Sequence, residues 1–463
     1  MPANEDNVHN AARARTGLVA VGVLLTVAII TLYLQRYGLS TLAVEHRAMR
    51  GWLAGDGLYA YRSPGTEAGA ALPPALALMF APLTLLPLRA AGWLLALTGL
   101  AALLLTIRVV AGPVARRYGR RRGPFVVAVA ALALVAEPVR AAIGLGRPEL
   151  LILALLAADL VALRRVSRAR HRSLNALLGC GRSGAGRPGI PAPSRPLRSR
   201  PACSEVDPAA PGPLRRAWTA GTWAGAGTGL ATALSPVALL FIVHLFVTRR
   251  RRAALTAMAT ATVVTLTALV LAPVESIAWY GTTMWELDRS APVSDTDNQS
   301  LAGVMARLYG FPAPPVLVWF SFGVLLVAVG LIRARSAHAD GDEVAAFTLI
   351  GLTAAVAGPV TTAAESLWLL PAVLILADTG LRRRLSVRLP RAARFTGMGH
   401  LAAAAAGYLV LISTPVWSLR WNVPAFALIV LVNALPWRHG TPTLPTRRPT
   451  AARRAAIPLP RGG

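Results

Sequence analysis

Long apolar stretches separated by short polar segments make up most of this chain of 463 residues. An apolar run of about twenty residues spans a lipid bilayer as a helix. The pattern predicts an all-α, polytopic integral membrane protein with about twelve transmembrane helices. The candidate spans are 16–34, 90–111, 124–143, 149–163, 217–232, 235–247, 253–273, 313–333, 344–360, 366–381, 398–416 and 423–437.

Two proline-containing segments modify this pattern. The stretch 72–87 is apolar, but prolines interrupt it repeatedly. Because proline breaks a spanning helix, we expect an interfacial or re-entrant segment there. The stretch 217–247 is expected to divide at Ser235-Pro236 into two spans, which keeps the basic segments before and after it on the same side of the membrane.

The composition favours a membrane protein over a soluble one. The mean hydropathy is +0.53 and only 15% of the residues are charged. The formal net charge is +28, and all 48 basic residues are arginine. The absence of lysine excludes a P-loop and a lysine Schiff base. Because the arginines fall in short runs between apolar stretches, we expect no nucleic-acid partner.

The arginines also predict the orientation, because cytoplasmic loops collect positive charge. Most of them lie in alternate connections and in the two terminal segments, 1–15 and 438–463. We therefore predict a multi-pass protein of the cell membrane with both termini in the cytosol. Membrane helices one to four would occupy 16–163, and helices five to twelve would occupy 217–437. The long loops 35–71 and 274–312 would then face outward.

The segment 164–216 separates the two groups of helices. It holds twelve arginines among many Pro, Gly and Ser residues, a composition that cannot bury a core. We expect a disordered cytosolic insertion, which serves either as a solvated linker or as a contact with anionic lipid headgroups. Cys180 and Cys203 both lie in this segment, and their spacing indicates neither a zinc site nor a disulfide framework.

The first outer loop predicts an amphipathic surface helix between Thr41 and Gly55. Its apolar residues recur at helical spacing, and we expect Glu45, Arg47 and Arg50 on its wetter side. A carboxylate that is partly desolvated at a membrane surface can act as a general base. Alternatively, Glu45 forms a surface ion pair with Arg47 or Arg50. The other candidates here are Asp56 for catalysis and His46, Tyr59 and Arg62 for substrate binding.

The second outer loop combines aromatic residues, such as Trp279 and Tyr280, with carboxylates and amides. Apolar sugar faces stack on aromatic rings, and sugar hydroxyls need donors and acceptors, so this loop is suited to a sugar. The aromatic residues would also fit an ordinary interfacial belt. The candidate substrate-binding residues are Asp297, Asn298 and Gln299. Asp295 and Asp297 alone are a weak indication of a divalent cation, so no metal site is assigned.

Ionisable residues at membrane depth form a third group of candidates. They are Glu137, Arg140, Arg147, Glu149 and Glu365, all at the predicted outer ends of spans. Such groups are costly in a membrane and therefore indicate function by default. Arg147 is the best candidate for an anionic phosphate, with Glu149 or Glu137 as its neutralising partner. The alternative is that these residues form internal ion pairs that hold helices together.

Several short segments in a fixed order resemble glycosyltransferase family 87, the polyprenyl-phosphate-mannose-dependent α-mannosyltransferases of actinobacteria. The resemblance runs from about residue 16 to about residue 435, without the insertion. The segments that carry it are Trp52-Leu-Ala-Gly55-Asp-Gly-Leu58-Tyr59, Leu72-Pro73-Pro74, Ala81-Pro82-Leu-Thr-Leu-Leu-Pro87-Leu, Ser235-Pro236 with Arg249–Arg252, Asn298-Gln299-Ser300-Leu301 with Arg307, and Trp368-Leu-Leu-Pro371.

The resemblance implies a GT-C membrane fold and transfer of a sugar, mannose or a related unit, from a polyprenyl phosphate to a lipid or glycan hydroxyl on the outer face. It implies no cofactor, since the lipid-linked donor is a substrate; metal dependence stays open. The chain departs from the family pattern at the presumed catalytic acid, where it has Thr41, with Glu45 one helical turn later. The usual Gly-Gln-x-Asn turn reads Gly146-Arg147-Pro148-Glu149, and the usual His-His pair reads Ala364-Glu365.

Two alternatives from other classes remain at this point. The chain could be a non-catalytic relative with the same fold, or a transporter or flippase of a lipid-linked intermediate. A transporter is expected to place polar residues at the bilayer midplane in broken helices, with an internal repeat. The sequence shows no such repeat, and its polar residues lie mainly at the predicted outer ends of the spans, which favours the transferase.

Overall fold

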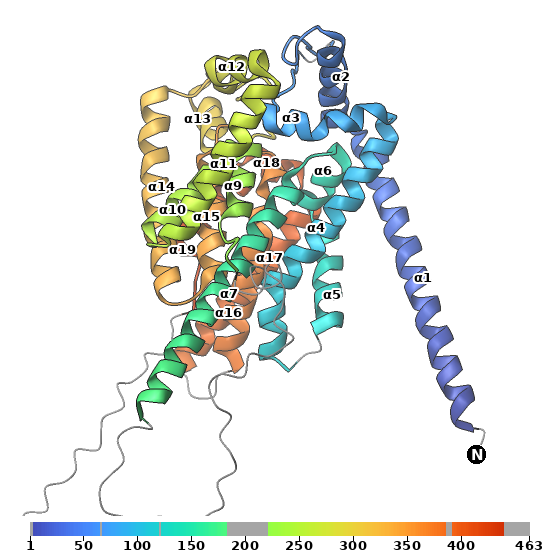
Figure 1. Cartoon of the computed structure of the whole chain (residues 1–463), viewed down its shortest axis with the longest axis vertical. Coiled ribbons are helices and arrows are strands. Elements are labelled where there is room, and N and C mark those ends of the chain that lie inside the picture. Colours follow the sequence, from blue (N-terminus) through green and yellow to red (C-terminus); the bar gives the residue numbers. More distant parts are fainter. Residues whose placement is uncertain (1–2, 65–66, 120–121, 183–220, 386–390, 439–463) are drawn as a thin grey trace, which may run out of the picture.

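The computed structural model describes residues 3–64, 67–119, 122–182, 221–385 and 391–438, and in this part of the chain it is helical throughout, with no strand longer than a single bridge between Arg62 and Gly69 (Figure 1). The helices and helical turns are α1 (Ala3–Tyr37), α2 (Ser40–Ala54), α3 (Pro74–Phe80), η1 (Ala81–Leu85), α4 (Leu88–Arg117), α5 (Arg122–Val135), α6 (Glu137–Leu145), α7 (Glu149–Arg182), α9 (Ala226–Leu234), η2 (Pro236–Ala238), α10 (Leu239–Val247), α11 (Arg251–Leu271), α12 (Pro273–Gly281), η3 (Thr283–Trp285), α13 (Leu301–Tyr309), α14 (Val316–Ala339), α15 (Glu343–Ala357), η4 (Glu365–Trp368), α16 (Leu369–Leu385), α17 (Arg391–Ser413), α18 (Val416–Arg420) and α19 (Val423–Ala434).

Five of these helices are long and apolar enough to cross a membrane within the described residues: α1, α4, α11, α14 and α17. The pair α5 and α6 makes a sixth if it is counted as one bent span. Large apolar side chains also cover the outside of these helices; Leu24 is 69% exposed on α1 and Leu317 is 82% exposed on α14. Lipid solvates such a surface where water would not. The all-α membrane architecture is therefore confirmed.

Most of the other predicted spans coincide with shorter helices, whereas 149–163 lies in the long helix α7. Each of the twelve predicted segments overlaps a helix, but α10, α15 and α19 are shorter than the length needed to cross a bilayer. The predicted span 124–143 is broken: α5 and α6 meet at a bend of 71°. Pro138 stands in the first turn of α6, where its missing N–H is tolerated, so proline begins the second helix at this bend.

The two predicted proline breaks are confirmed. The stretch 72–87 forms two short helices, α3 and η1, rather than one span. α9 ends at Leu234, Ser235 has an extended backbone, and η2 begins at Pro236. A residue before proline is disfavoured in the α-helical region, which explains why the helix stops there.

The segment 164–216 differs from the prediction in its first part. α7 does not end at the membrane boundary but continues to Arg182, so 164–182 is helical rather than disordered. Hydrogen bonds tie its start to neighbouring helices: Arg164 donates to the Val109 carbonyl at 3.2 Å, and Arg250 donates to Ser167 Oγ at 3.4 Å. The rest of the insertion, 183–216, and the side chains of both cysteines lie outside the described residues.

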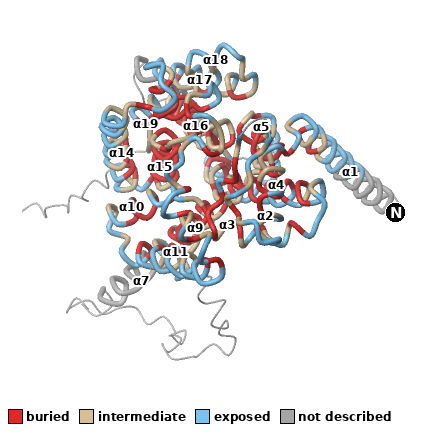
Figure 2. Tube along the Cα trace, turned by 90° about the horizontal axis from the view of Figure 1, so that it is seen from above, coloured by how far each residue is buried: buried red, intermediate tan, exposed pale blue. Residues whose placement is uncertain are grey.

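The buried side chains form three main clusters. The largest includes residues of α7, α9, α10, α11, α14, α15, α16 and α19. The second includes residues of α1, α4, α5, α6 and α7. The third lies under α2 and includes Leu42, Met49, Leu58, Leu72 and Phe80. Figure 2 shows the buried residues in the middle of the helices and α1 largely exposed at the side. The third cluster fixes α2 against α3 and η1 at the end of the bundle (Figure 1).

One buried carboxylate holds the middle of the bundle together. Asp159 on α7 is fully buried, and its oxygens accept hydrogen bonds from the backbone N–H groups of Gly225 (3.1 Å), Gly227 (3.2 Å) and Thr228 (2.7 Å). These are N–H groups at the start of α9, which have no partner within the helix. A carboxylate there also interacts favourably with the positive end of the helix dipole. Asp159 is thus an N-cap supplied by another helix.

Replacing Asp159 by leucine is expected to destabilise the protein by several kcal/mol, because a buried N–H that loses its partner costs about 1–3 kcal/mol. Asp159→Asn keeps one acceptor oxygen and should cost less. The measurement is the midpoint of thermal unfolding of the detergent-solubilised protein, with the loss of folded protein monitored by size-exclusion chromatography. Asp288→Asn, at an exposed position, is the control and should leave the midpoint unchanged. Equal midpoints for wild type and Asp159→Leu would contradict the capping role.

Candidate active site

A cavity of about 720 Å³ lies where α2, the turn between α6 and α7, and the loops 35–71 and 274–312 meet. Its walls include carboxylates, an arginine, hydroxyl groups and an aromatic ring. The polar and aromatic lining residues are Ser40, Thr41, Glu45, Ser63, Arg147, Glu149, Ser235, Trp279, Ser290, Asp295 and Glu365. Of the two cavities described for this part of the chain, it is the one that Glu45, Arg147 and Asp295 line in addition to Glu149 and Glu365. It is therefore the candidate site.

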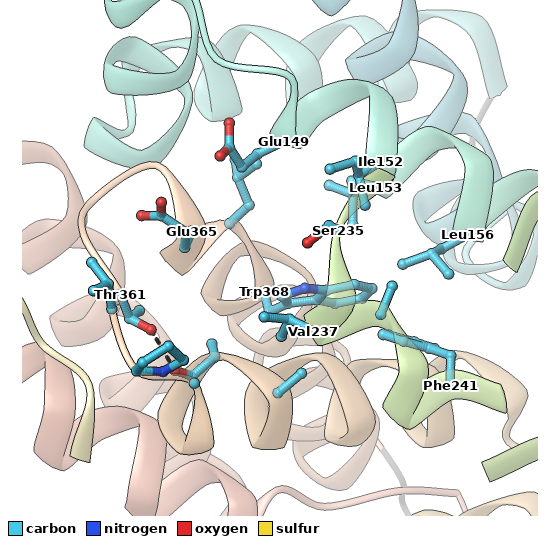
Figure 3. A pocket seen from close by; sticks show the side chains of 17 residues that line it. Glu149, Ile152, Leu153, Leu156, Ser235, Val237, Phe241, Thr361, Glu365 and Trp368 are labelled. Carbon is cyan, nitrogen blue, oxygen red and sulfur yellow. Dashed lines mark hydrogen bonds between the residues drawn. The ribbon is translucent and has the colours of Figure 1, made fainter. Parts of the chain in front are cut away.

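A second, smaller cavity of about 230 Å³ adjoins the first and is mainly apolar. The two share Glu149, Ser235 and Glu365 among their lining residues. Figure 3 shows Glu149 and Glu365 at one end of the smaller cavity, and Leu156 and Phe241 at the other. We call this smaller cavity the apolar slot. It extends the polar cavity into the helix bundle and offers room for hydrocarbon.

α2 brings Glu45 to the polar cavity. The helix buries Leu42 and Met49 in the cluster beneath it, and the Glu45 side chain lines the cavity with only 8% of its surface exposed. The prediction that Glu45 shares the wet side of the helix with Arg47 and Arg50 is therefore wrong, because only those two arginines are exposed. The turn before α7 covers the helix on the side of Glu45, which the spacing of apolar residues alone did not reveal.

Gly146 allows this close approach. It ends α6 with φ +75°, and a Cβ atom on it would lie 2.7 Å from Cβ of Leu42. Only glycine combines this backbone conformation with so little space. The next residue, Arg147, is thereby placed in the cavity beside α2, where its Nε lies 3.5 Å from Thr41 Oγ1.

Arg147 is paired with two carboxylates. It forms an ion pair with Glu365, and its Nη1 lies 3.7 Å from Glu149 Oε1. All three side chains are largely buried, with 15 to 26% of their surfaces exposed. Glu137 is not a partner of Arg147; it pairs with Arg140 at 2.6 Å and accepts a hydrogen bond from Tyr37. The predicted partner Glu149 is found beside Arg147, and Glu365 is the closer one.

The electrostatics of this group follow from its burial. Burial raises the pKa of Glu45 to about 8, against the effect of Arg147, and the nearby Glu149 raises it further. Burial would lower the pKa of Arg147, but Glu365, Glu149 and Glu45 outweigh this and raise it. Arg147 therefore stays charged, while Glu45 can exchange a proton near neutral pH.

The remaining candidates in the loop 35–71 do not line the cavity. Asp56 is exposed at the end of α2 and does not line it. The ring of His46 is buried against the carbonyl of Leu86 (3.2 Å). Arg62 is an exposed partner of Glu286 at 3.3 Å. Tyr59 donates to the Leu72 carbonyl at 2.8 Å and stacks on Trp279. Glu45 alone of this group lines the cavity.

The amides of the second loop support the loop itself. Asn298 Nδ2 donates to the carbonyls of Val293 (3.0 Å) and Pro359 (3.3 Å), and its Oδ1 accepts from Thr361 N (2.9 Å). Gln299 binds backbone groups in the same way. Their polar atoms are thus used to attach the loop to the bundle. Asp297 is exposed, and the neighbouring Asp295 is the carboxylate that lines the cavity.

Sequence patterns missed several lining residues. The sequence indicates Ser235 only as a helix break and, with Trp368, as part of the segments that carry the family resemblance; Phe241 of the apolar slot stands in an apolar run where nothing distinguishes it. Among the described residues, no group of three or more His, Cys, Asp or Glu side chains is placed to hold a metal ion. What the arrangement offers is a proton acceptor, a fixed cation and an apolar extension in one connected space.

Comparison with known proteins places the chain in a family. The model of glycosyltransferase family 87 matches residues 72–181 and 209–361. Two curated relatives, from Mycobacterium tuberculosis and Mycolicibacterium smegmatis, both carry the name polyprenol-phosphate-mannose-dependent alpha-(1-2)-phosphatidylinositol mannoside mannosyltransferase. The first is 31% identical over 172 residues, which are 37% of this chain and 39% of the relative; the second is 28% identical over 179 residues, 37% of this chain and 40% of the relative.

The alignments thus span about two fifths of the length of these relatives. No solved structure matches the chain. The family match, by contrast, covers more than half of the sequence and includes Arg147, Glu149 and Ser235 of the cavity. On this basis, the chain belongs to glycosyltransferase family 87.

Proposed function

We propose that this protein is a membrane glycosyltransferase that moves a sugar, mannose, from a polyprenyl-phosphate donor to a hydroxyl of a lipid or glycan acceptor on the outer face of the membrane. The names of the two relatives support the donor and suggest a phosphatidylinositol mannoside as the acceptor. The observation that carries the proposal is a buried carboxylate, Glu45, in the same cavity as a largely buried arginine, Arg147.

Glu45 is the proposed general base. In the reaction, Glu45 takes the proton of the acceptor hydroxyl as the acceptor oxygen forms a bond to the anomeric carbon of the sugar. The bond between that carbon and the phosphate oxygen breaks, and the polyprenyl phosphate leaves with the electron pair. A base with a pKa near the working pH suits this role, and burial gives Glu45 a pKa of about 8.

Arg147 is the proposed partner of the leaving phosphate. Arginine binds phosphate through paired N–H donors, and a fixed cation in a site shielded from water stabilises charge that develops during the reaction. Arg147 is held by Glu365 and Glu149 in this structure. A phosphate would therefore share Arg147 with Glu365 or displace it.

The apolar slot supports a lipid-linked donor. It begins at Glu149 and Glu365, next to Arg147, and continues between Leu153, Leu156 and Phe241. A phosphate bound at Arg147 would thus have apolar walls beside it for the attached hydrocarbon. A nucleotide-linked donor would gain nothing from such a slot. No cofactor is part of the proposal, and a divalent metal is not required by it.

The topology belongs to the same proposal. We infer about twelve membrane crossings in a GT-C-like arrangement, with membrane helices in 16–163 and 217–437 and with both termini, 1–15 and 438–463, in the cytosol. The arginine distribution supports this orientation. The loops that border the polar cavity would then lie on the outer side, where a lipid-linked donor rather than a nucleotide sugar is needed.

A non-catalytic relative is the alternative that one observation favours. Arg147 is already neutralised by carboxylates, and Thr41 stands where the family resemblance expects an acid. A scaffold would keep such an ion pair for stability alone. A transporter or flippase is less favoured, since the ionisable groups converge on one cavity near the loops.

Glu45→Gln is expected to lower mannosyl transfer by a factor of about 100 or more, since general-base catalysis contributes on the order of 10²–10⁴. The assay uses membranes that contain the protein, radiolabelled polyprenyl-phosphate mannose and a phosphatidylinositol mannoside acceptor. Wild-type activity should rise from pH 6 to about pH 8, as the Glu45 carboxyl loses its proton.

The stability of the protein should change with pH in the opposite direction to its activity. A carboxyl whose folded pKa lies above its unfolded value stabilises the fold at low pH, and this contribution is lost as the pH rises through about 8. Glu45→Gln should therefore unfold at a higher temperature than wild type at pH 9.

Asp56→Asn tests the other carboxylate that the sequence predicts to be catalytic. If wild type transfers mannose and Asp56→Asn, not Glu45→Gln, abolishes it, the assignment of the base is wrong.

The double variant Arg147→Gln/Glu365→Gln separates a catalytic Arg147 from a structural one. Arg147→Gln alone leaves buried carboxylates without their cation and should lower the unfolding midpoint. Adding Glu365→Gln removes one of these charges and should restore part of the stability, while transfer stays at least about 100-fold reduced if Arg147 acts on the phosphate. Recovery of transfer together with stability would show that Arg147 is structural, in favour of the non-catalytic role of this ion pair.

A further inference from the structure

We propose that Trp279 forms the wall of the cavity against which a sugar ring of the acceptor binds, called the sugar wall below. We propose further that Arg289 positions Trp279 by acting through Tyr59. This inference rests on the proposed function, because it assigns the acceptor to the outer part of the same cavity. Trp279 lines the polar cavity but not the apolar slot. It therefore lies at the loop side, whereas the slot for hydrocarbon begins at Glu149 and Glu365.

Trp279 has an unused donor. The residue is only 6% exposed, and its indole Nε1 is buried with no hydrogen-bond partner among the described residues. A buried donor without a partner costs about 1–3 kcal/mol, so such groups in a folded protein call for an explanation. A hydroxyl of a ligand in the cavity would supply the missing acceptor, and the indole ring would supply an apolar surface for a sugar face.

Trp279 is held in place by one stacked neighbour. The ring of Tyr59 lies 5.9 Å from that of Trp279, centroid to centroid, at an interplanar angle of 28°. Tyr59 is itself fixed at its other end, since its hydroxyl donates to the Leu72 carbonyl at 2.8 Å. A stacked pair of this kind contributes beyond the area it buries and defines the ring orientation.

Arg289 fixes Tyr59 and joins the two outer loops. Its guanidinium lies 5.3 Å from the centre of the Tyr59 ring, and Nη2 donates to the Tyr59 carbonyl at 2.5 Å. Nε donates to the Ala70 carbonyl at 2.6 Å, and Nη1 pairs with Glu286 at 2.7 Å. The Arg289 side chain is only 4% exposed.

The backbone beside Arg289 is built around this side chain. Gly69 N donates to the Arg289 carbonyl at 2.8 Å, and a Cβ on Gly69 would lie 3.2 Å from the guanidinium. Gly69 and Ser290 both line the cavity, one from each loop. Arg289 thus fixes the loop wall of the cavity and the aromatic pair together, and is a positioning residue rather than one that touches the substrate.

The kinetic test uses the full-length protein with radiolabelled polyprenyl-phosphate mannose and a phosphatidylinositol mannoside. Trp279→Phe keeps a ring to stack on Tyr59 but removes the indole N–H. It should raise the acceptor KM about 3- to 10-fold, as expected for one lost hydrogen bond, with kcat and the donor KM within about 2-fold. Arg289→Met should raise the acceptor KM similarly.

Two controls separate this role from general damage to the loops. Trp285→Phe changes an exposed tryptophan of the same loop and should leave all constants unchanged. The double variant Trp279→Phe/Arg289→Met should be no worse than the more severe single variant, because both act on one contact. Fully additive effects would show that Arg289 does not act through Trp279 and would overturn that half of the proposal.

Binding is measured separately from transfer, by saturation-transfer NMR with methyl α-mannopyranoside and the solubilised protein. Wild type and Trp285→Phe should saturate the sugar ring protons, and Trp279→Ala should reduce this by at least half. If wild type transfers no mannose, but binds the sugar and loses this binding in Trp279→Ala, the transferase proposal fails while the assignment of Trp279 as the sugar wall stands. If Trp279→Phe and Trp279→Ala match wild type in acceptor KM and in binding, the sugar wall is refuted.

Discussion

The burial of Arg147 among carboxylates is the constraint on which the site depends. A buried charge must be paired, and Arg147 meets this requirement through Glu365 and Glu149, which come from different parts of the chain. The ion pair therefore fixes the turn before α7 relative to the turn before α16. Gly146 permits the approach of that turn to α2, which brings Glu45 into the same space. The position of the proposed base, Glu45, and its electrostatic environment thus both depend on the turn that carries Arg147.

The same constraint relates the cavity to the membrane. The ionisable side chains converge where the helices end and the loops begin, while the slot beyond them is lined by Leu153, Leu156 and Phe241. A substrate with a charged group between a sugar and a hydrocarbon chain matches this sequence of environments along one space. Asp159 holds α9 in place, and the Arg289 contacts join the loops 35–71 and 274–312; the end of α9 and residues of both loops line the polar cavity.

The sequence predicted the parts that depend on local patterns. Apolar length predicted the helices, proline predicted the breaks at 72–87 and at Ser235, and the cost of buried charge indicated Arg147, Glu149 and Glu365. It did not predict which side of α2 is covered, because that depends on contacts with a turn about a hundred residues later. For the same reason Asn298 and Gln299 looked like substrate ligands, although their polar atoms bind backbone groups. A polar side chain in a sequence does not reveal whether its partner is a ligand or the chain itself.

Several departures from the pattern that the family resemblance implies lie together in the structure. Thr41, Arg147, Glu149 and Glu365 all line one cavity, whereas Ala364 does not line it. Arg147 contacts Thr41 and pairs with both glutamates. The charge that Arg147 adds to the site is thus neutralised by the charges that Glu149 and Glu365 add. Unrelated substitutions that only abolished function would leave such charges unpaired in the interior. Glu45 lies one turn from Thr41 and forms no ion pair within the described part of the chain, and its Oε2, like that of Glu149, is buried without a hydrogen bond there. A group kept in that state is costly for stability alone, which is the physical argument for a base relocated within the site rather than lost from it.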